Sequence, residues 1–266
     1  MAHPYTLWMA AFVVVPIILI AAFAFTSPDG GFTLRNYASM GKFLSVFLRS
    51  FWLAFLSTVI CLILGYPIAY IFARFSGRWQ KVMMMLIMLP MWMNFLLRTY
   101  AWKAILETRS GLLNRFLDLL GVAPLHIMDT PAAVVIGMVY NFLPFMILPI
   151  YSVIVKLDRS VIEAAQDLGA APRGVFRRVV LPLSLPGVLS GITMVFVPAV
   201  STFVISKILG GSTNILLGDL IEMQFLGSAY NPHLGSAIAL VMMVVVMIFM
   251  YVMNRFGDGE EQAVMM

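Results

Sequence analysis

The sequence is poor in charge and nearly lacks cysteine. Only 11% of its 266 residues are charged and 62% are hydrophobic, whereas a soluble globular domain has about 25% charged residues. This composition excludes an ordinary soluble protein and indicates one that lies in a membrane. Its single cysteine, Cys61, excludes an intrachain disulfide and a cysteine-based metal site. His3, His126 and His233 lie in separate segments, a spacing that does not predict a metal site either.

A nucleotide-binding signature is also missing. The Walker A pattern, Gly-x-x-x-x-Gly-Lys-Ser/Thr, occurs nowhere in the chain, so the chain cannot hold ATP phosphates by that mechanism. The longest polar connection has about 30 residues, whereas a soluble catalytic domain needs about 50 or more. We therefore predict a single membrane domain over residues 1–266, with no enzymatic activity and no cofactor of its own.

Long apolar runs are what the sequence has instead. A membrane-spanning helix needs about 20 mostly apolar residues, and six runs meet this requirement. They cover approximately residues 7–26, 47–73, 82–102, 131–155, 186–207 and 235–254. Prolines occur inside all but the last run, which predicts kinked helices. We therefore predict an all-α polytopic membrane protein with six transmembrane helices.

The net charge of +5 would suggest a nucleic-acid partner in a soluble protein, but here its distribution among the loops is more informative. If the amino terminus is cytoplasmic, the two inner loops carry most of the basic residues: Arg74, Arg78, Lys81, Lys156, Arg159, Arg173, Arg177 and Arg178. The longer outer loops carry only Arg35, Lys42, Lys103, Arg109 and Arg115. Because inner loops are enriched in Lys and Arg, we predict that both termini are cytoplasmic, that lipid surrounds the chain and that nucleic acid is not a partner.

The longest inner connection, residues 156–185, is polar and basic between two apolar runs. Ser160 and Glu163 have the spacing of a capping box, which predicts the start of a short helix. Gly169 can end that helix in a left-handed turn, and Pro172 suits the first turn of a second helix. The segment therefore predicts two short helices that form a compact knob. An ordinary amphipathic inner loop is the alternative.

Six residues of this knob resemble the EAA loop of ABC-importer permeases, the cytoplasmic loop that couples a permease to its ATPase. They are Glu163, Ala164, Ala165, Gly169, Leu181 and Pro182. Further segments look like the first of the two permeases of spermidine/putrescine importers, and together they extend the resemblance over nearly the whole chain. They are Gly65-Tyr66-Pro67, Leu89-Pro90-Met91-Trp92, Leu97-Arg98-Thr99-Tyr100, Val139-Tyr140-Asn141-Phe142-Leu143-Pro144-Phe145 and Leu209-Gly210-Gly211.

This resemblance implies the type I ABC-importer permease fold, in a bacterial inner membrane, for a chain that forms a translocation pathway for polyamines. It implies as partners a second permease, two ATPase subunits that bind ATP and Mg²⁺, and an extracytoplasmic solute-binding protein. Similar permeases handle iron, phosphonate and other solutes, so such cargoes stay alternatives. An ion-coupled secondary transporter would need a carboxylate or His near the centre of a span, where the runs have none. A non-transporting scaffold is a further alternative.

Polar and aromatic side chains inside the apolar runs are candidates for the lining of the pathway: Trp92, Asn94, Tyr100, Tyr140, Asn141, Ser201 and Thr202. Aromatic faces can hold a flexible dication through cation–π contacts worth roughly 0.5–2 kcal/mol each. Hydrogen bonds between helices explain the Asn and Thr residues as well as contact with a cargo does.

The last outer connection, residues 210–234, is apolar enough to fold back into the protein. Its acidic residues, Asp219 and Glu222, could attract a cation or contact a binding protein, with a merely solvated face as the alternative. Arg98 and Lys207 lie near the outer ends of their runs, where snorkelling to the interface is the default interpretation. Lys207 would repel a polyamine unless it points away or pairs with one of those two acids.

Overall fold

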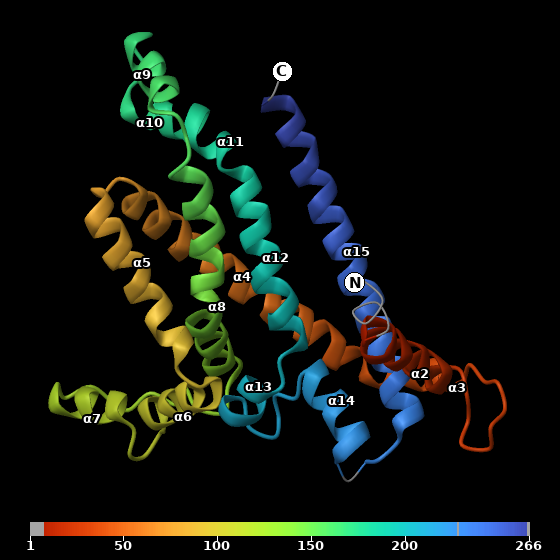
Figure 1. Ribbon diagram of the computed structural model, residues 1–266. Helices are drawn as coiled ribbons and strands as arrows, with labels where there is room; N and C mark the ends of the chain where they lie inside the picture. Colours follow the sequence, from red (N-terminus) through yellow and green to blue (C-terminus); the bar gives the residue numbers. More distant parts are fainter. Residues whose placement is uncertain (1–7, 228, 265–266) are drawn as a thin grey trace.

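The computed structural model describes residues 8–227 and 229–264, and its secondary structure is helical (Figure 1). Within these residues the only β-type pairing is an isolated bridge between Thr26 and Phe32, so the prediction of an all-α protein is confirmed. The helices are η1 (Ala10–Val14), α2 (Val15–Ala24), α3 (Arg35–Met40), η2 (Gly41–Phe43), α4 (Leu44–Ala73), α5 (Gly77–Trp92), α6 (Phe95–Leu106), α7 (Leu112–Leu119), α8 (Pro131–Ile154), α9 (Arg159–Asp167), α10 (Pro172–Val175), η3 (Phe176–Val180), α11 (Leu181–Leu183), α12 (Leu185–Ser201), α13 (Val204–Leu209), α14 (Leu217–Leu226) and α15 (Pro232–Val264).

Each predicted apolar run corresponds to helical structure, although the runs differ in form. Three helices of the described chain are long and apolar enough to cross a membrane alone: the continuous helical stretch Arg35–Ala73, which comprises α3, η2 and α4, and the helices α8 and α15. Two bent pairs, α5 with α6 and α10–α11 with α12, raise the number to five if each pair forms one span. The first run is the shorter apolar helix over Ala10–Ala24.

The third run is broken and not merely kinked. Helices α5 and α6 meet at 91°, because Met93 and Asn94 have extended ψ angles of 149° and 132°. The Asn94 side chain then accepts a hydrogen bond from the Leu96 amide at 2.8 Å, which starts α6 afresh. Pro90 cannot donate a backbone hydrogen bond within α5, and this further weakens the end of that helix.

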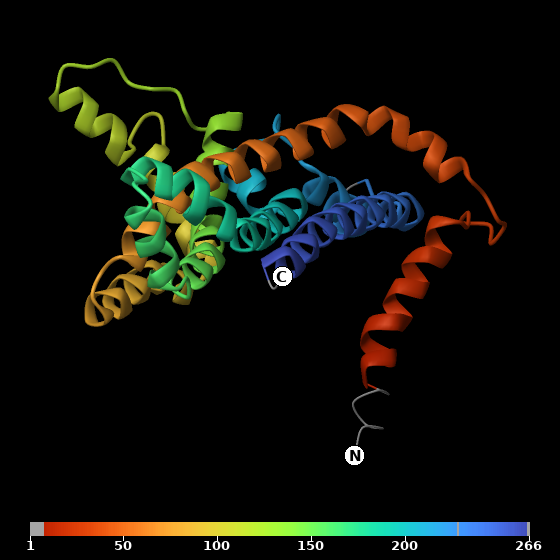
Figure 2. The same cartoon turned by 90° about the horizontal axis from the view of Figure 1, so that it is seen from above.

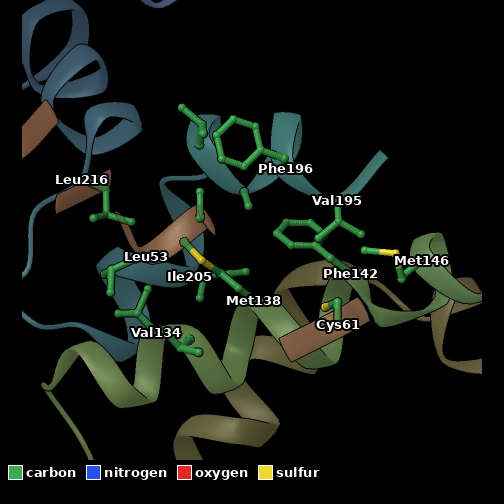
Figure 3. Close-up of a cluster of buried hydrophobic side chains, with 14 of the residues drawn as sticks. Leu53, Cys61, Val134, Met138, Phe142, Met146, Val195, Phe196, Ile205 and Leu216 are labelled. Carbon is green, nitrogen blue, oxygen red and sulfur yellow. The ribbon is translucent and has the colours of Figure 1, made fainter. Parts of the chain in front are cut away.

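The centre of the bundle is formed by α4, α8 and α12, which contact one another along much of their lengths. Figure 3 shows Phe142 of α8 against Val195 of α12 and Met138 of α8 beside Ile205 of α13, with Cys61 of α4 close to Phe142. These side chains are all buried, so Cys61 is a packing residue.

Two glycines allow the three central helices to approach closely. A Cβ at Gly65 of α4 would lie 3.0 Å from the Met146 side chain of α8, and a Cβ at Gly191 of α12 would lie 2.8 Å from the sulfur of the same methionine. Met146 is fully buried between these glycines. Larger residues at either position would force the helices apart, because packed interiors have little spare volume.

The two ends of the molecule carry different elements. Figure 1 shows α9, α10 and α11 at one end, where α15 also finishes, and α6, α7, α13 and α14 at the other. We call the first the knob end, after the knob of residues 156–185. Helix α2 projects from the bundle and contacts α15 (Figure 2).

Candidate functional site

The first knob helix, α9, begins at Arg159 and is capped by Asp158. The Asp158 carboxylate accepts a hydrogen bond from the Ser160 amide at 2.9 Å. Ser160 therefore lies inside the helix, and the predicted capping box of Ser160 and Glu163 is wrong, because the aspartate two residues earlier captures the free amide first. The hydrogen bonds from the backbone and hydroxyl of Ser160 lower the pKa of Asp158.

The far end of α9 agrees with the prediction. Gly169 has a φ of +81°, its amide donates to the Gln166 carbonyl at 2.8 Å, and the Ala170 amide donates to the Ala165 carbonyl at 3.0 Å. These two hydrogen bonds form a Schellman motif, in which a left-handed glycine closes the helix. Pro172 then opens α10 in its first turn, as predicted. The knob is therefore a helix–turn–helix with defined ends.

The residues that resemble the EAA loop differ in their exposure. Glu163, Ala164, Gly169 and Pro182 are exposed, while Ala165 and Leu181 are half-buried. The sequence reasoning missed Leu168, whose side chain is 89% exposed at the tip of α9. The sequence could have indicated Leu168, because this residue stands directly before the glycine that ends the helix. An apolar group so exposed among polar residues fits a contact with another protein.

Aromatic rings anchor the knob to the bundle. Phe176 follows α10 and packs edge-on against Tyr66 and Tyr70 of α4, with ring centroids 5.8 Å and 5.2 Å away. The Tyr66 hydroxyl also lies 2.8 Å from the Ser184 hydroxyl at the start of α12. Tyr66 and Tyr70 are four residues apart and therefore share one face of α4. A displacement of the knob would move these rings and, through them, α4.

A cavity of about 510 Å³ separates α9 from the end of the bundle. Tyr70, Arg74 and Gln80 line one part of it, and Glu163 and Gln166 of α9 line another. The Arg74 guanidinium lies over the Tyr70 ring, 4.2 Å from its centroid. The aromatic contacts of Phe176 join the knob to α4 beside this cavity.

The seven pathway candidates lie in different environments. Asn141 and Thr202 are buried, Tyr140 is half-buried, and Trp92, Asn94, Tyr100 and Ser201 are exposed. The structure does not gather all seven on one exposed surface, and their part in a pathway stays a prediction.

Two of these candidates have clear structural contacts. Tyr140 packs edge-on against Trp102 of α6, with centroids 5.3 Å apart. The Asn141 amide group donates to the Gly137 carbonyl of its own helix at 2.9 Å. These contacts join α6 to α8 and stabilise α8 itself, so both residues have a structural role whether or not a cargo reaches them.

Lys207, Asp219 and Glu222 meet at the end opposite the knob. The Lys207 ammonium lies 2.7 Å and 2.9 Å from the two Glu222 oxygens, so Lys207 pairs with an acid, one of the two arrangements that would keep it from repelling a cation. Asp219 is buried and accepts from the Leu216 amide at 2.9 Å, capping α14. Helix α14 is buried along much of its length, so this connection folds back into the protein as predicted.

Comparison with known proteins identifies the family. The family model described as "Binding-protein-dependent transport system inner membrane component" matches residues 62–258. The chain belongs to this family. It is therefore a multi-pass membrane component of a transport system, and the exposed knob with its six EAA-like residues lies within the matched region.

Individual relatives place this permease more closely. It is 40% identical over 248 residues to the spermidine/putrescine transport system permease protein PotB of Salmonella typhimurium (strain SL1344), covering 90% of this chain and 86% of that protein. It is 38% identical over 258 residues to PotB of Escherichia coli (strain K12), covering 93% of each. The inner membrane ABC transporter permease protein YdcU of Escherichia coli (strain K12) is 30% identical over 226 residues, covering 80% of this chain and 71% of YdcU.

Solved structures show the same fold at low sequence identity. A chain of a bacterial ABC transporter involved in the import of the acidic polysaccharide alginate superposes with a TM-score of 0.82 at 16% identity, covering 96% of this chain and 92% of that chain. A chain of the MetNI methionine ABC transporter in an inward-facing conformation gives 0.62 at 17% identity, covering 84% and 98%. The predicted ABC-importer permease fold is confirmed.

Proposed function

We propose that the chain is the permease subunit through which an ATP-driven importer moves spermidine or putrescine across a bacterial inner membrane. The observation that carries this proposal is the identity of 37–40% to PotB permeases over about nine tenths of the chain. The structure supports the proposed coupling to an ATPase, because the knob exposes Glu163 on α9 and Leu168 and Gly169 at the turn that ends this helix.

The assembly that we propose has four kinds of component. This chain and a second permease form the pathway, two ATPase subunits bind ATP and Mg²⁺, and a solute-binding protein delivers the cargo on the extracytoplasmic side. The knob end and both termini face the cytoplasm, in agreement with the excess of Lys and Arg in loops at that end. The chain itself supplies binding and movement, and ATP hydrolysis takes place on the partner subunits.

Coupling follows from the contacts of the knob. Closure of the ATPases on ATP carries the exposed face of α9 with them. Phe176 transmits this displacement to Tyr66 and Tyr70 of α4, and the hydrogen-bonding distance between Tyr66 and Ser184 links α4 to the start of α12. Since α4 and α12 both pack on α8, one input at the knob shifts the central bundle between inward-facing and outward-facing states. ATP supplies the free-energy difference between these states.

The proposed cargo agrees with the charges at the outer end. Lys207 is neutralised by Glu222, so it does not present a free ammonium to an arriving polyamine. Trp92 and Tyr100 expose aromatic faces, which attract ammonium groups without the deep binding of a fixed carboxylate. A route of this kind lets a dication pass without trapping it.

Uptake by the complete transporter tests the proposal. Radiolabelled spermidine and putrescine are offered to cells that lack their own polyamine systems and express all four components. We expect saturable uptake that a Walker A Lys→Ala change in the ATPase abolishes. If the complex assembles and hydrolyses ATP but takes up neither polyamine, the cargo assignment is wrong, and iron or phosphonate becomes the cargo to test.

A further inference from the structure

A second cavity at the knob end collects arginines from two distant parts of the chain. It has a volume of about 630 Å³ and adjoins the cavity of about 510 Å³ described above, with which it shares Tyr70, Arg74 and Pro172. Its other lining residues in the described chain are Arg173, Phe176, Arg177 and Leu181. This lining contains three arginines and no acidic residue, so the cavity attracts an anion.

The three arginines are available to such an anion. Arg74 directly follows α4, and its guanidinium lies over the Tyr70 ring and donates to the Tyr70 hydroxyl. A guanidinium has five N–H donors, so this contact orients Arg74 and leaves most of its donors free. Arg173 and Arg177 are four residues apart in the helical segment α10–η3, and both are exposed. The one ion pair within the described chain lies at the opposite end, so it neutralises none of these three side chains.

The sequence around Arg74 indicates the level of the cavity in the membrane. Residues 50–73 contain no charged side chain, and Arg74 is the first charge after them. A helical stretch of this length spans the hydrocarbon core, which is about 30 Å thick. The opposite wall of the cavity belongs to Pro172–Leu183, the first part of a bent pair that is apolar enough to form one span. The cavity therefore lies at the end of two spans, at the level of the lipid headgroups.

The chemistry of the cavity suits a lipid phosphate. The planar guanidinium binds phosphate oxygens through parallel hydrogen bonds, and basic pockets beside membrane helices bind anionic headgroups. The rings of Tyr70 and Phe176 add apolar surface to the walls. Ile71 and Phe75, which follow Tyr70 and Arg74 in the sequence, are exposed apolar side chains that acyl chains can contact. A soluble phosphate ion would leave this apolar surface uncovered.

We propose that this cavity binds the phosphate group of an anionic phospholipid from the leaflet at the knob end. The bound phosphate contacts Arg74 after α4 and Arg177 of the knob, and so joins the two. A carboxylate of the ATPase is the competing occupant. It is disfavoured because Glu163 and Leu168, the exposed residues of α9 and its end that we expect to meet the ATPase, do not line this cavity.

Lipid binding to the purified chain tests the proposal. The chain is stripped of lipid in a neutral detergent and titrated with phosphatidylglycerol, with phosphatidylcholine and inorganic phosphate as parallel probes. Native mass spectrometry counts the bound molecules. We expect a single tightly bound phosphatidylglycerol, and phosphatidylcholine bound about tenfold more weakly, because the arginines repel its trimethylammonium group. Equal binding of the two lipids, or inorganic phosphate binding as tightly as phosphatidylglycerol, would overturn the proposal.

Two neighbouring arginines provide a matched pair of variants. Arg177 lines the cavity, whereas Arg178 is also exposed but does not line it. We expect Arg177→Gln to weaken phosphatidylglycerol binding about tenfold, because charge-assisted hydrogen bonds are lost. Arg177→Lys should weaken it less, because lysine keeps the charge but lacks the planar fork, and Arg178→Gln should bind like wild type.

Equal losses in Arg177→Gln and Arg178→Gln would show that the knob attracts lipid only through diffuse charge, and would refute the site. Thermal unfolding without added lipid checks the fold of each variant. If Arg177→Gln unfolds early, Arg173→Gln takes its place, since Arg173 lines the same cavity. Normal binding by a folded cavity variant would refute the site as well.

Assembly with the ATPase separates the lipid from the competing occupant. Phosphatidylglycerol is counted in the same way on the complex with bound ATPase, and we expect it to stay bound. Displacement of the lipid by the ATPase would assign the arginines to the ATPase and overturn the proposal. If no ATPase copurifies with the wild-type chain, the proposed function fails, whereas the lipid site is still decided by the measurements on the chain alone.

Discussion

The knob end and the opposite end are both built from short helices, yet they are held together differently. At the knob, helix ends are set locally by Asp158 and Gly169, and the outer face is exposed. At the opposite end, α13 and α14 are largely buried and are fixed by contacts with distant segments, such as the hydrogen bond from the Leu217 amide to the Ser50 hydroxyl at 2.8 Å. The knob is thus exposed for contact with a partner protein, whereas the opposite end stabilises the helix bundle.

The largest effect is expected at the contact between the knob and the bundle. Phe176→Ala removes the ring that packs on Tyr66 and Tyr70, and we expect a loss of about 2–4 kcal/mol of stability, because Phe176 is half-buried and Phe→Ala in a full core costs about 3–5 kcal/mol. Thermal unfolding in detergent measures the loss, and substrate-stimulated ATP hydrolysis by the complete transporter should fall with it.

Phe116→Ala is the matched control for this variant. Phe116 is an exposed aromatic residue of α7 at the opposite end, so its truncation should leave both unfolding and ATP hydrolysis close to wild type. If Phe176→Ala unfolds normally and stays fully coupled, the aromatic anchor does not transmit motion from the knob.

A smaller effect is expected at the left-handed glycine. Gly169→Ala leaves room for a Cβ, since no atom lies within 4 Å of its ideal position, but the φ of +81° costs a non-glycine residue about 1–2 kcal/mol. We expect a normally inserted bundle with a frayed knob, weaker copurification of the ATPase and reduced stimulation of hydrolysis.

The control for the glycine variant is Gly41→Ala. Gly41 has a φ of −54° and likewise has no atom within 4 Å of an ideal Cβ, so alanine fits there without strain. Equal ATPase recruitment by Gly169→Ala and Gly41→Ala would show that the turn geometry does not matter for docking.

The two ends can be compared directly through their caps. Asn94 accepts from the Leu96 amide at 2.8 Å and Asp158 from the Ser160 amide at 2.9 Å, so each side chain caps a helix in the same way. We expect Asn94→Ala to cost about 0.5–2 kcal/mol of global stability, because α6 packs on α8 and α13. Asp158→Ala should leave global unfolding nearly unchanged and weaken ATPase docking. Identical effects on unfolding would remove the distinction between the ends.

Lowering the pH should weaken the Asp158 cap and leave the Asn94 cap unchanged. The pKa of Asp158 is lowered below its usual 3.8 in the folded protein, so the carboxylate stabilises the knob above that value and the contribution disappears as pH falls through the lowered pKa. ATPase docking should therefore not change through titration of this cap between about pH 5 and pH 8, because the aspartate stays ionised throughout that range. Asn94 does not titrate.

Prediction from the sequence was most successful for features that neighbouring residues determine. Gly169 and Pro172 mark the turn of the knob through backbone preferences that any chain obeys, and the apolar runs follow from the thickness of the bilayer. The capping box failed because two candidate caps, Asp158 and Ser160, lie two residues apart and only one can take the free amide. The contact of Phe176 with Tyr66 and Tyr70 joins residues about 110 positions apart, and local patterns carry no information about such pairs.

The smallest effect is expected at the outer ion pair. Lys207 is exposed and bonded to Glu222, and exposed pairs contribute little to stability, so Lys207→Ala should unfold like wild type. Its removal frees the Glu222 carboxylate at the outer end, and a freed carboxylate attracts a polyamine more strongly than a neutralised one. We therefore expect unchanged or modestly raised spermidine uptake at low ionic strength, with the difference shrinking as salt is added. Lys42→Ala, at another exposed outer cation, serves as the control. A clear fall in uptake that is specific to Lys207→Ala would show that the ion pair stabilises a conformation of the outer end that transport requires.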